Sequence, residues 1–438
     1  MLELEAKLSL EAGDPLMLTP YLNNGSIKLA QDLSLVTLTE NIGFRSHAGF
    51  FTIDEKYGSN LYFWYFPPFS KKEKAPVVLW LQGGPGGSSL FGLFAELGPL
   101  IAKEAGFALR KYHWALNCHL VFIDSPVGTG FSFTHNDLGY CTDEKCIAIG
   151  LYNTMQQFYT LFPNLRSNDF YITGESYAGK YIPSLAMEVH KRNANGQEKR
   201  INLKGLAIGN GYCDPINQLD YGSYLYQHGL LDNNQRDVFK QYQDQIKQLI
   251  RRESWVRADL LMDKLIDGVV SNTSFFKMFT GFNSYYNFLY TDSEYDSKKL
   301  LNLLQNDKVR HSIHVGGLPF HDGQVVVMHL AYDMMKSVAS DISTLLSHYK
   351  IVFYNGQLDI VVAYPLTVNF LRNLNFSSSK EYKTALRIIW RVGEDVAGYV
   401  KKAGNLTEVL VRNAGHMVPM DQPKWAFDLI TRVVTDGF

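Results

Sequence analysis

The stretch that decides the fold is "DFYITGESYAGKY", residues 169–181. An apolar run leads to a glycine just before Ser176, and the residues that follow are compatible with a helix. This pattern is typical of a nucleophile elbow, a tight strand-to-helix turn that exposes a serine hydroxyl at the edge of a sheet. Gly174 and Ala178 provide the small side chains that such a turn needs on either side. A structural serine in an ordinary turn would look the same, so distant residues must decide.

Other apolar runs show no alternation, namely "PVVLWLQ", "HLVFIDS", "LKGLAIGN", "KIVFYNG" and "EVLVRN". Strands that are buried on both faces have this composition, because helices cover both sides of a parallel sheet. Before them, "HAGFFTIDEKYGSNLYFWYFPP" places two aromatic-rich segments around a turn and predicts an antiparallel hairpin. We therefore predict an α/β fold with a mixed, mostly parallel central sheet flanked by helices.

The middle of the chain has a different pattern. Apolar residues recur at helical spacing around residues 238–250 and again around 255–266, and no continuous buried-strand run occurs. We interpret residues 213–340 as a helical insertion over the active-site edge of the sheet. Residues 1–212 and 341–438 then form the two parts of the core. The aromatic run at 274–290 could line a pocket or simply pack in a core.

Two further residues complete a candidate catalytic set. Asp359 follows the strand run "KIVFYNG", and His416 follows the last strand run, "EVLVRN". Both would lie at the same sheet edge as Ser176, and the chain order Ser, Asp, His is that of α/β-hydrolases. A base that removes the serine proton and an acid that orients this base make such a serine a nucleophile.

The glycine-rich loop "LWLQGGPGGSS" follows a predicted strand. Such a loop can cradle phosphate, but it then needs a lysine or a G-x-G-x-x-G spacing that leads into a helix, and neither is present. The alternative is an oxyanion hole, in which Gly84 and Tyr177 each offer a backbone N–H to the tetrahedral oxyanion.

Taken together, these motifs resemble the serine carboxypeptidase family across nearly the whole chain. The motifs are "LWLQGGPGGSS", "FAELGP", "FIDSPVGTGFSF", "GESYAGKYIP", "LAIGNGYCDP", "NGQLDIVV" and "GHMVPMDQP". The glutamine in the glycine-rich loop and "SYYNFLY" make the chain most similar to the vitellogenic carboxypeptidase-like branch. The resemblance implies an α/β-hydrolase fold with a helical insertion. It also implies release of the C-terminal residue from peptides or proteins, usually at acidic pH, without metal or organic cofactor.

The resemblance also assigns residues. It gives the three catalytic roles to the serine, aspartate and histidine named above, and the oxyanion donors to Gly84 and Tyr177. Gln82, Glu96 and Glu175 match the positions that hold the terminal carboxylate of the substrate. A permanently ionised glutamate would repel that carboxylate, whereas two partly desolvated glutamates can share a proton and become a donor.

The chain departs from the family in places. Gln82 stands where asparagine is more common, which changes the reach of the amide by one methylene. Gly87 and Val362 occupy positions where some members have cysteine. Four cysteines cannot reproduce the usual disulfides, and "CTDEKC" could hold either a local disulfide or free thiols.

The composition gives no indication of nucleic-acid binding, a membrane span or a metal site. The 438 residues are 46% hydrophobic and 19% charged, with a net charge of -1, so nothing indicates a nucleic-acid partner. No apolar run approaches the roughly 20 residues that span a bilayer. No set of ligands at metal spacing occurs. The residues do not indicate an oligomeric state.

The prediction of the cellular compartment rests on the resemblance, which implies a lysosomal or secreted glycoprotein. The N-terminus shows no signal peptide as it stands. Sequons at Asn24, Asn272, Asn375 and Asn405 support secretion weakly. Two rival functions stay open, an esterase or acyltransferase on the same elbow and a non-catalytic binding protein. Glu96 and Glu175 argue against the first, and the complete catalytic set argues against the second.

Overall fold

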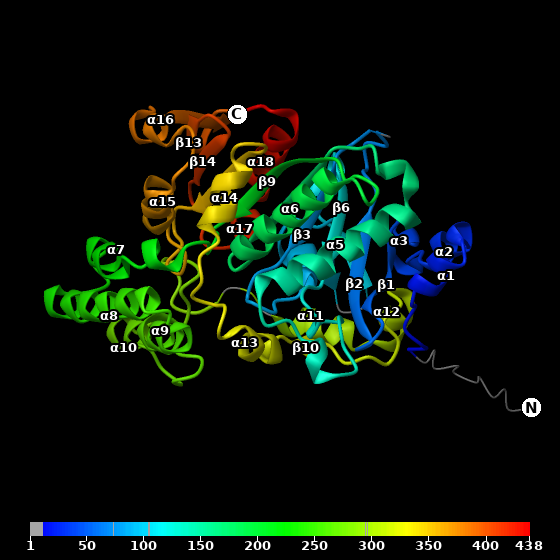
Figure 1. Cartoon of the computed structure of the whole chain (residues 1–438), viewed down its shortest axis with the longest axis horizontal. Helices are drawn as coiled ribbons and strands as arrows, with labels where there is room; N and C mark the ends of the chain where they lie inside the picture. Colours follow the sequence, from blue (N-terminus) through cyan, green and yellow to red (C-terminus); the bar gives the residue numbers. More distant parts are fainter. Residues whose placement is uncertain (1–11, 73, 104–105, 294, 296) are drawn as a thin grey trace, which may run out of the picture.

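The computed structural model describes residues 12–72, 74–103, 106–293, 295 and 297–438 (Figure 1). Residues 1–11, on which the expectation about a signal peptide depends, lie outside the described residues. Three short helices precede the sheet: α1 (Thr19–Asn23), α2 (Ile27–Leu33) and α3 (Thr37–Glu40).

One large mixed sheet forms the centre of the molecule (Figure 1). Its inner strands are parallel, and antiparallel strands flank them on both sides. The predicted hairpin is confirmed as β1 and β2, and each predicted apolar run is a strand. The spatial order is β1 (His47–Asp54), β2 (Ser59–Phe66), β6 (His119–Ile123), β3 (Val77–Leu81), β8 (Phe170–Glu175), β9 (Leu203–Gly209), β11 (Lys350–Gly356), β14 (Leu406–Val411), β13 (Asp395–Ala403) and β12 (Ile388–Val392).

Strand β3 shows why the inner runs do not alternate. Val77, Leu79 and Leu81 point into one hydrophobic cluster, whereas Val78 and Trp80 point into another on the opposite face. All five side chains are fully buried. An apolar residue at every position is therefore the natural solution for a strand with helices on both sides.

Helices cover both faces of this sheet (Figure 1). One face packs against α5 (Glu144–Leu161), α6 (Ala178–Asn195), α14 (Ala339–Leu345) and α15 (Tyr364–Asn373). The other face packs against α18 (Pro423–Thr435) and against a π-helical turn, η1 (Gly92–Glu96). The predicted α/β-hydrolase architecture is thus confirmed.

The predicted insertion consists of two structurally different halves. The first half contains α7 (Tyr221–Gln227), α8 (Asn233–Arg251), α9 (Trp255–Met262), η6 (Asp263–Asp267) and α10 (Phe275–Thr280), which share a hydrophobic cluster and lie to one side of the sheet (Figure 1). The second half returns along the main body as α11 (Ser297–Leu304), α12 (Asp307–Ser312), β10 (His321–Asp322) and α13 (Gln324–Leu330). A short strand, β10, pairs with β7 (Thr129–Gly130), which the pattern did not predict.

The structure decides whether "CTDEKC" holds a local disulfide or two free thiols. Cys141 and Cys146 form a disulfide at the start of α5. Cys118 and Cys213 are free and buried.

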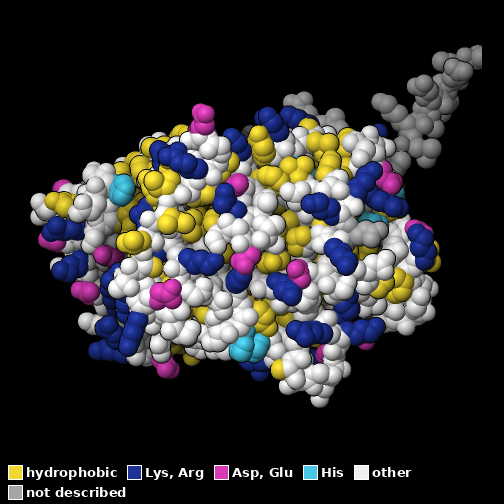
Figure 2. Space-filling view, turned by 90° about the horizontal axis from the view of Figure 1, so that it is seen from above, with side chains coloured by type: hydrophobic (Ala, Val, Ile, Leu, Met, Phe, Trp, Pro, Cys, Tyr) yellow, Lys and Arg dark blue, Asp and Glu magenta, His cyan; other side chains and the backbone are white. Residues whose placement is uncertain are grey.

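The surface charge is mixed, in agreement with the near-zero net charge of the chain. On the face shown in Figure 2, Lys and Arg side chains are scattered among neutral, acidic and apolar ones. Among the described residues, no helix is both long enough and apolar enough to cross a membrane.

Candidate active site

Ser176 stands between the end of β8 and the start of α6, in the left-handed region at φ 62°. A β-carbon on Gly174 would come within 2.2 Å of the Leu81 carbonyl oxygen, so only glycine fits there. The N–H of Ser176 donates to Gly209 O at 2.9 Å, which fixes the turn to β9. The predicted elbow is present, and it presents Ser176 to a cavity of about 520 Å³.

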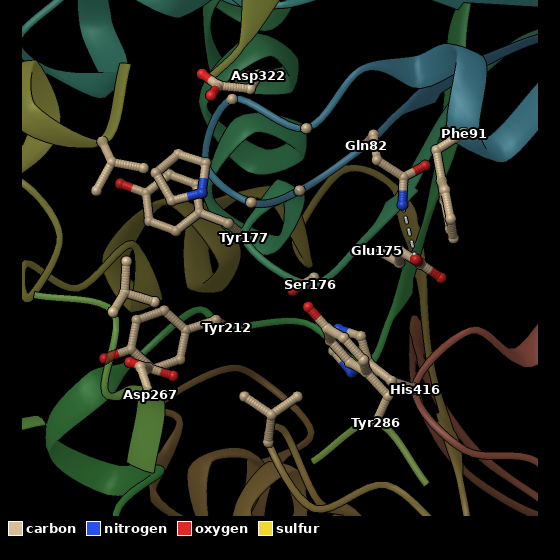
Figure 3. A pocket seen from close by; sticks show the side chains of 18 of the residues that line it. Gln82, Phe91, Glu175, Ser176, Tyr177, Tyr212, Asp267, Tyr286, Asp322 and His416 are labelled. Carbon is tan, nitrogen blue, oxygen red and sulfur yellow. Dashed lines mark hydrogen bonds between the residues drawn. The ribbon is translucent and has the colours of Figure 1, made fainter. Parts of the chain in front are cut away.

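The structure brings His416 to the same cavity as Ser176 and places Asp359 against His416. His416 Nδ1 lies 2.8 Å from Asp359 Oδ2, and both side chains are buried. Because Nδ1 faces the aspartate, Nε2 remains for the serine, and Figure 3 shows the His416 ring next to Ser176. The three residues come from the ends of different strands, as their positions after the apolar runs predicted.

Two features around this pair were not found in the sequence. Asn210, at the end of β9, donates from Nδ2 to Asp359 Oδ2 at 2.6 Å. In addition, residues 285–288 of the insertion pass between the aspartate loop and the histidine loop. Tyr286 O accepts the N–H of His416 at 2.7 Å, and Phe288 N donates to Leu358 O at 2.9 Å. Residues 285–288 therefore hydrogen-bond to both the loop that carries Asp359 and the loop that carries His416.

Few signals in the sequence could have revealed these residues. An asparagine directly after a strand run was visible in "LAIGNG", but nothing local connects it to a residue 149 positions away. The aromatic run at 274–290 proves to serve both uses considered for it. Phe276 is buried in the core of the insertion, whereas Tyr285 and Tyr286 line the cavity.

The glycine-rich loop packs directly against the elbow. A β-carbon on Gly83 would lie 2.6 Å from the backbone nitrogen of Tyr177, so the contact requires glycine. Gly84 follows with φ 117°, a conformation that side chains strongly disfavour. Within the described part of the chain, the N–H groups of Gly84 and Tyr177 donate no hydrogen bond. Both N–H groups are therefore available to an oxyanion.

Gln82 and Glu175 lie together at one end of the cavity (Figure 3), and Glu96 contacts the same Gln82 amide. Trp80 Nε1 donates to Gln82 Oε1 at 2.9 Å, so the amide nitrogen of Gln82 must face the glutamates. That nitrogen lies 2.8 Å from Glu175 Oε1 and 3.2 Å from Glu96 Oε1. One amide therefore bridges two buried carboxyls.

Burial determines the charge of this pair. It raises the pKa of Glu96 to about 7 and the pKa of Glu175 well above its usual range. For Glu175, the negative charge of Glu96 adds to the effect of burial. At acidic pH both carboxyls therefore hold protons, and the pair can donate hydrogen bonds to an anion.

The far wall of the cavity is formed by the insertion and is chemically different. Asp267 lies beside the ring of Tyr212 (Figure 3), and Asp259 lines the same wall. Burial raises the pKa of each of these aspartates to about 7. No Lys or Arg is among the described residues that line the cavity. The cavity therefore has one end where an amide contacts two buried carboxyls and another end that is aromatic and acidic.

Among the described residues, no group of three or more His, Cys, Asp or Glu side chains is arranged to hold a metal ion.

The comparisons with known proteins agree with this geometry. The model of the serine carboxypeptidase family matches residues 37–436. The chain is 50% identical over 427 residues to a venom serine carboxypeptidase from Apis mellifera, with 96% of this chain and 91% of that protein covered. It is also 50% identical over 426 residues to a vitellogenic carboxypeptidase from Aedes aegypti, with coverage of 96% and 90%.

Among solved structures, the chain is similar to Kex1(Δ)p, a prohormone-processing carboxypeptidase from Saccharomyces cerevisiae. The TM-score is 0.78 at 23% identity, with 93% of this chain and 95% of that chain covered. This likeness shows that the two share a fold. The family match and the two insect relatives also establish the family. The chain belongs to the serine carboxypeptidase family, as its motifs predicted, and is a serine-type carboxypeptidase.

Proposed function

We propose that Ser176, His416 and Asp359 form the catalytic triad of this carboxypeptidase. The observation that carries the assignment is the 2.8 Å contact between His416 Nδ1 and Asp359 Oδ2, with His416 and Ser176 lining the same cavity. This contact holds the imidazole in the tautomer whose Nε2 is free to accept the serine proton.

The reaction then proceeds by acyl transfer to water. His416 removes the hydroxyl proton while Ser176 Oγ bonds to the carbon of the last peptide carbonyl, and the oxyanion accepts hydrogen bonds from Gly84 and Tyr177. The C–N bond breaks as the imidazolium gives its proton to the departing amino acid. A water molecule, deprotonated by His416, attacks the acyl-enzyme, and the proton returns to Ser176 as the shortened peptide leaves. Each oxyanion donor contributes about 3 kcal/mol to transition-state stabilisation.

Gln82, Glu96 and Glu175 recognise the terminal carboxylate in this proposal. Their buried donors lie at the cavity end nearest the elbow, where the departing residue must sit. Because the two glutamates donate only while protonated, recognition works best at acidic pH. A pocket for neutral esters or acyl chains has no need for two protonated carboxyls, which is why we favour peptide and protein C-termini as substrates.

The nucleophile is tested with Ser176→Ala and a blocked dipeptide. We expect turnover to disappear, together with labelling by an organophosphate that reacts with the active serine. Wild-type turnover in this variant would overturn the assignment. Recognition of the free carboxylate is tested by comparing the KM of the dipeptide with the KM of its C-terminal amide as pH rises.

We also propose that the chain is a lysosomal or secreted glycoprotein. The Cys141–Cys146 disulfide fits an oxidising compartment. Three of the sequon asparagines are exposed, whereas Asn405 is half-buried and donates to Leu346 O at 2.9 Å. We expect a glycosidase that removes N-linked sugars to increase the electrophoretic mobility of the secreted protein. Unchanged mobility would argue against the glycoprotein assignment.

Finally, we propose that residues 213–340 act as a cap on a core made of residues 1–212 and 341–438. The separate hydrophobic cluster of the first half of this segment supports a cap, while the packing of its second half against the main body ties the cap to the core. Limited proteolysis that cuts within 213–340 and leaves the core fragments associated is the expected result. Cuts distributed equally over all three segments would contradict it.

A further inference from the structure

Asn210 is a fully buried side chain at the carboxyl end of β9, one strand away from the elbow. Its Oδ1 accepts the N–H of Gly356 at 3.2 Å, and its Nδ2 donates to Asp359 Oδ2 at 2.6 Å. Since the oxygen must face an N–H group, the orientation of the amide is determined. The amide nitrogen is therefore held against the carboxylate of Asp359.

The carboxylate of Asp359 is surrounded by donors. Oδ2 accepts from Asn210, from His416 Nδ1 at 2.8 Å and from Val362 N at 3.3 Å, while Oδ1 accepts from Val361 N at 3.0 Å. Asn210 and His416 thus share one oxygen. Hydrogen bonds from neutral donors stabilise a carboxylate and reduce the additional stabilisation that a neighbouring cation can provide.

This competition matters because the pair is buried. In a site shielded from water, a lone aspartate would strongly favour the protonated imidazole. A protonated His416 cannot accept the proton of Ser176. An enzyme that works at acidic pH therefore needs an aspartate that orients the imidazole without holding it in the charged form.

Other ionisable groups also face the pair. Glu96 and Glu175 lie toward His416 and Asp359 from η1 and β8, and Tyr221, Tyr224 and Tyr286 approach Asp359 from the insertion. Tyr224 also donates its hydroxyl to the main-chain oxygen of Asp359 at 2.7 Å. None of these groups donates to Oδ2 of the aspartate. Replacing Asn210 therefore removes one donor from this oxygen and leaves His416 Nδ1 and Val362 N.

We propose that Asn210 is a positioning residue that limits the hold of Asp359 on the protonated form of His416 and thereby extends catalysis to lower pH. It acts through Asp359 and does not touch the substrate. The inference rests on the triad assigned under Proposed function.

The experiment measures kcat and KM of a blocked dipeptide from pH 3 to 8 for Asn210→Gly and Asn210→Leu. Glycine adopts the φ of 41° at this position without strain, and leucine keeps the branched shape in a larger side chain without a donor. We expect the acidic limb of kcat/KM to move to higher pH by about one unit, a tenfold change in proton binding. KM on the plateau should stay within about twofold, because substrate contacts are unchanged.

Asn355 provides a matched control. It is buried at the end of the neighbouring strand β11 and donates to Val362 O at 3.0 Å, so it supports the same loop without touching the carboxylate of Asp359. In Asn355→Ala, the pH midpoint of the acidic limb of kcat/KM is expected to equal that of the parent, even if kcat itself changes. Rates of the parent and of the Asn210 and Asn355 variants are expressed per serine labelled by an organophosphate, so a loss of folded protein does not enter them; those of Ser176→Ala and His416→Ala are expressed per total protein.

The outcomes separate this inference from the triad itself. Ser176→Ala and His416→Ala are measured in the same assay, and turnover in either one overturns the proposed function. If both are inactive while the Asn210 variants keep the parent midpoint, only the role of Asn210 is overturned. An equal shift in Asn355→Ala has the same meaning, because a loosened loop would then explain the effect.

Discussion

The pH dependence of substrate binding should reveal the two buried glutamates. Between pH 5 and 8 the C-terminal carboxylate of a peptide stays ionised, because its pKa is near 3.5. Any change in its binding over this range must therefore come from the enzyme. Burial raises the pKa of Glu96 to about 7, and that of Glu175 lies well above its usual range.

The size of the effect follows from these values. Below pH 6 the pair is neutral and donates to the substrate; above pH 7 it loses a proton, and the bound carboxylate then faces a negative charge. If only the protonated pair binds, KM rises about tenfold between pH 6 and 8, a cost of about 1.4 kcal/mol. The same peptide with a C-terminal amide carries no charge there, so its KM should be nearly constant.

The assay is steady-state hydrolysis of one blocked dipeptide as free acid and as amide, at half-unit steps of pH. The double variant Glu96→Gln with Glu175→Gln keeps volume and donors but cannot ionise, so its KM for the free acid should become flat. Glu144→Gln is a matched control, because burial raises the pKa of Glu144 to about 8 and this residue lies outside the cavity lining. The reasoning is refuted if KM rises equally for acid and amide, or if the double variant keeps the parent pH dependence.

Three further predictions address other parts of the molecule. Lys180 is fully buried and pairs with Asp333 at 3.0 Å, whereas Lys336 reaches the same aspartate from the surface at 3.3 Å. Lys180→Met should therefore lower the free energy of unfolding in urea by about 3–5 kcal/mol and Lys336→Met by less than about 1 kcal/mol; equal losses would show that burial does not matter here. Because the pKa of Asp267 is raised to about 7, its carboxyl becomes anionic as pH rises. The preference in kcat/KM for lysine over leucine as the penultimate residue should then grow about fivefold from pH 5 to 8, and Asp267→Asn should reduce this growth, with Asp259 left to titrate on the same wall; a preference that does not change with pH would contradict it. A β-carbon on Gly83 would lie within 2.7 Å of three atoms of the elbow, so Gly83→Ala should lower kcat by about a hundredfold, and a kcat near that of the parent would disprove the tight fit.

The local pattern of the sequence was sufficient to predict the sheet and to select three candidate catalytic residues at its edge. An apolar residue at each position from Val77 to Leu81 requires cover on both faces, which in turn requires a parallel sheet between helices. Parallel strands end at one edge, so polar residues directly after such runs must meet there. Ser176, Asp359 and His416 follow this rule: Ser176 and His416 line one cavity, and Asp359 contacts His416 at 2.8 Å.

The sequence could not show which side chains complete the site from a distance. The bond from Asn210 to Asp359 depends on the register of β9 against β11, and no local pattern encodes that register. The same is true of residues 285–288, because a loop from the helical insertion reaches the two catalytic loops only after the whole chain has folded.

The glutamates show the same division between sequence and structure. Resemblance to a family placed Glu96 and Glu175 at the carboxylate-binding positions, and their residue type was enough for that. Their protonation depends on burial and on the single amide of Gln82 that bridges them. Periodicity and residue type therefore determined the architecture and the candidate residues, because those depend on short-range burial. Tertiary structure alone decided the charges and hydrogen bonds of the site, because these depend on the contacts made between segments far apart in the chain.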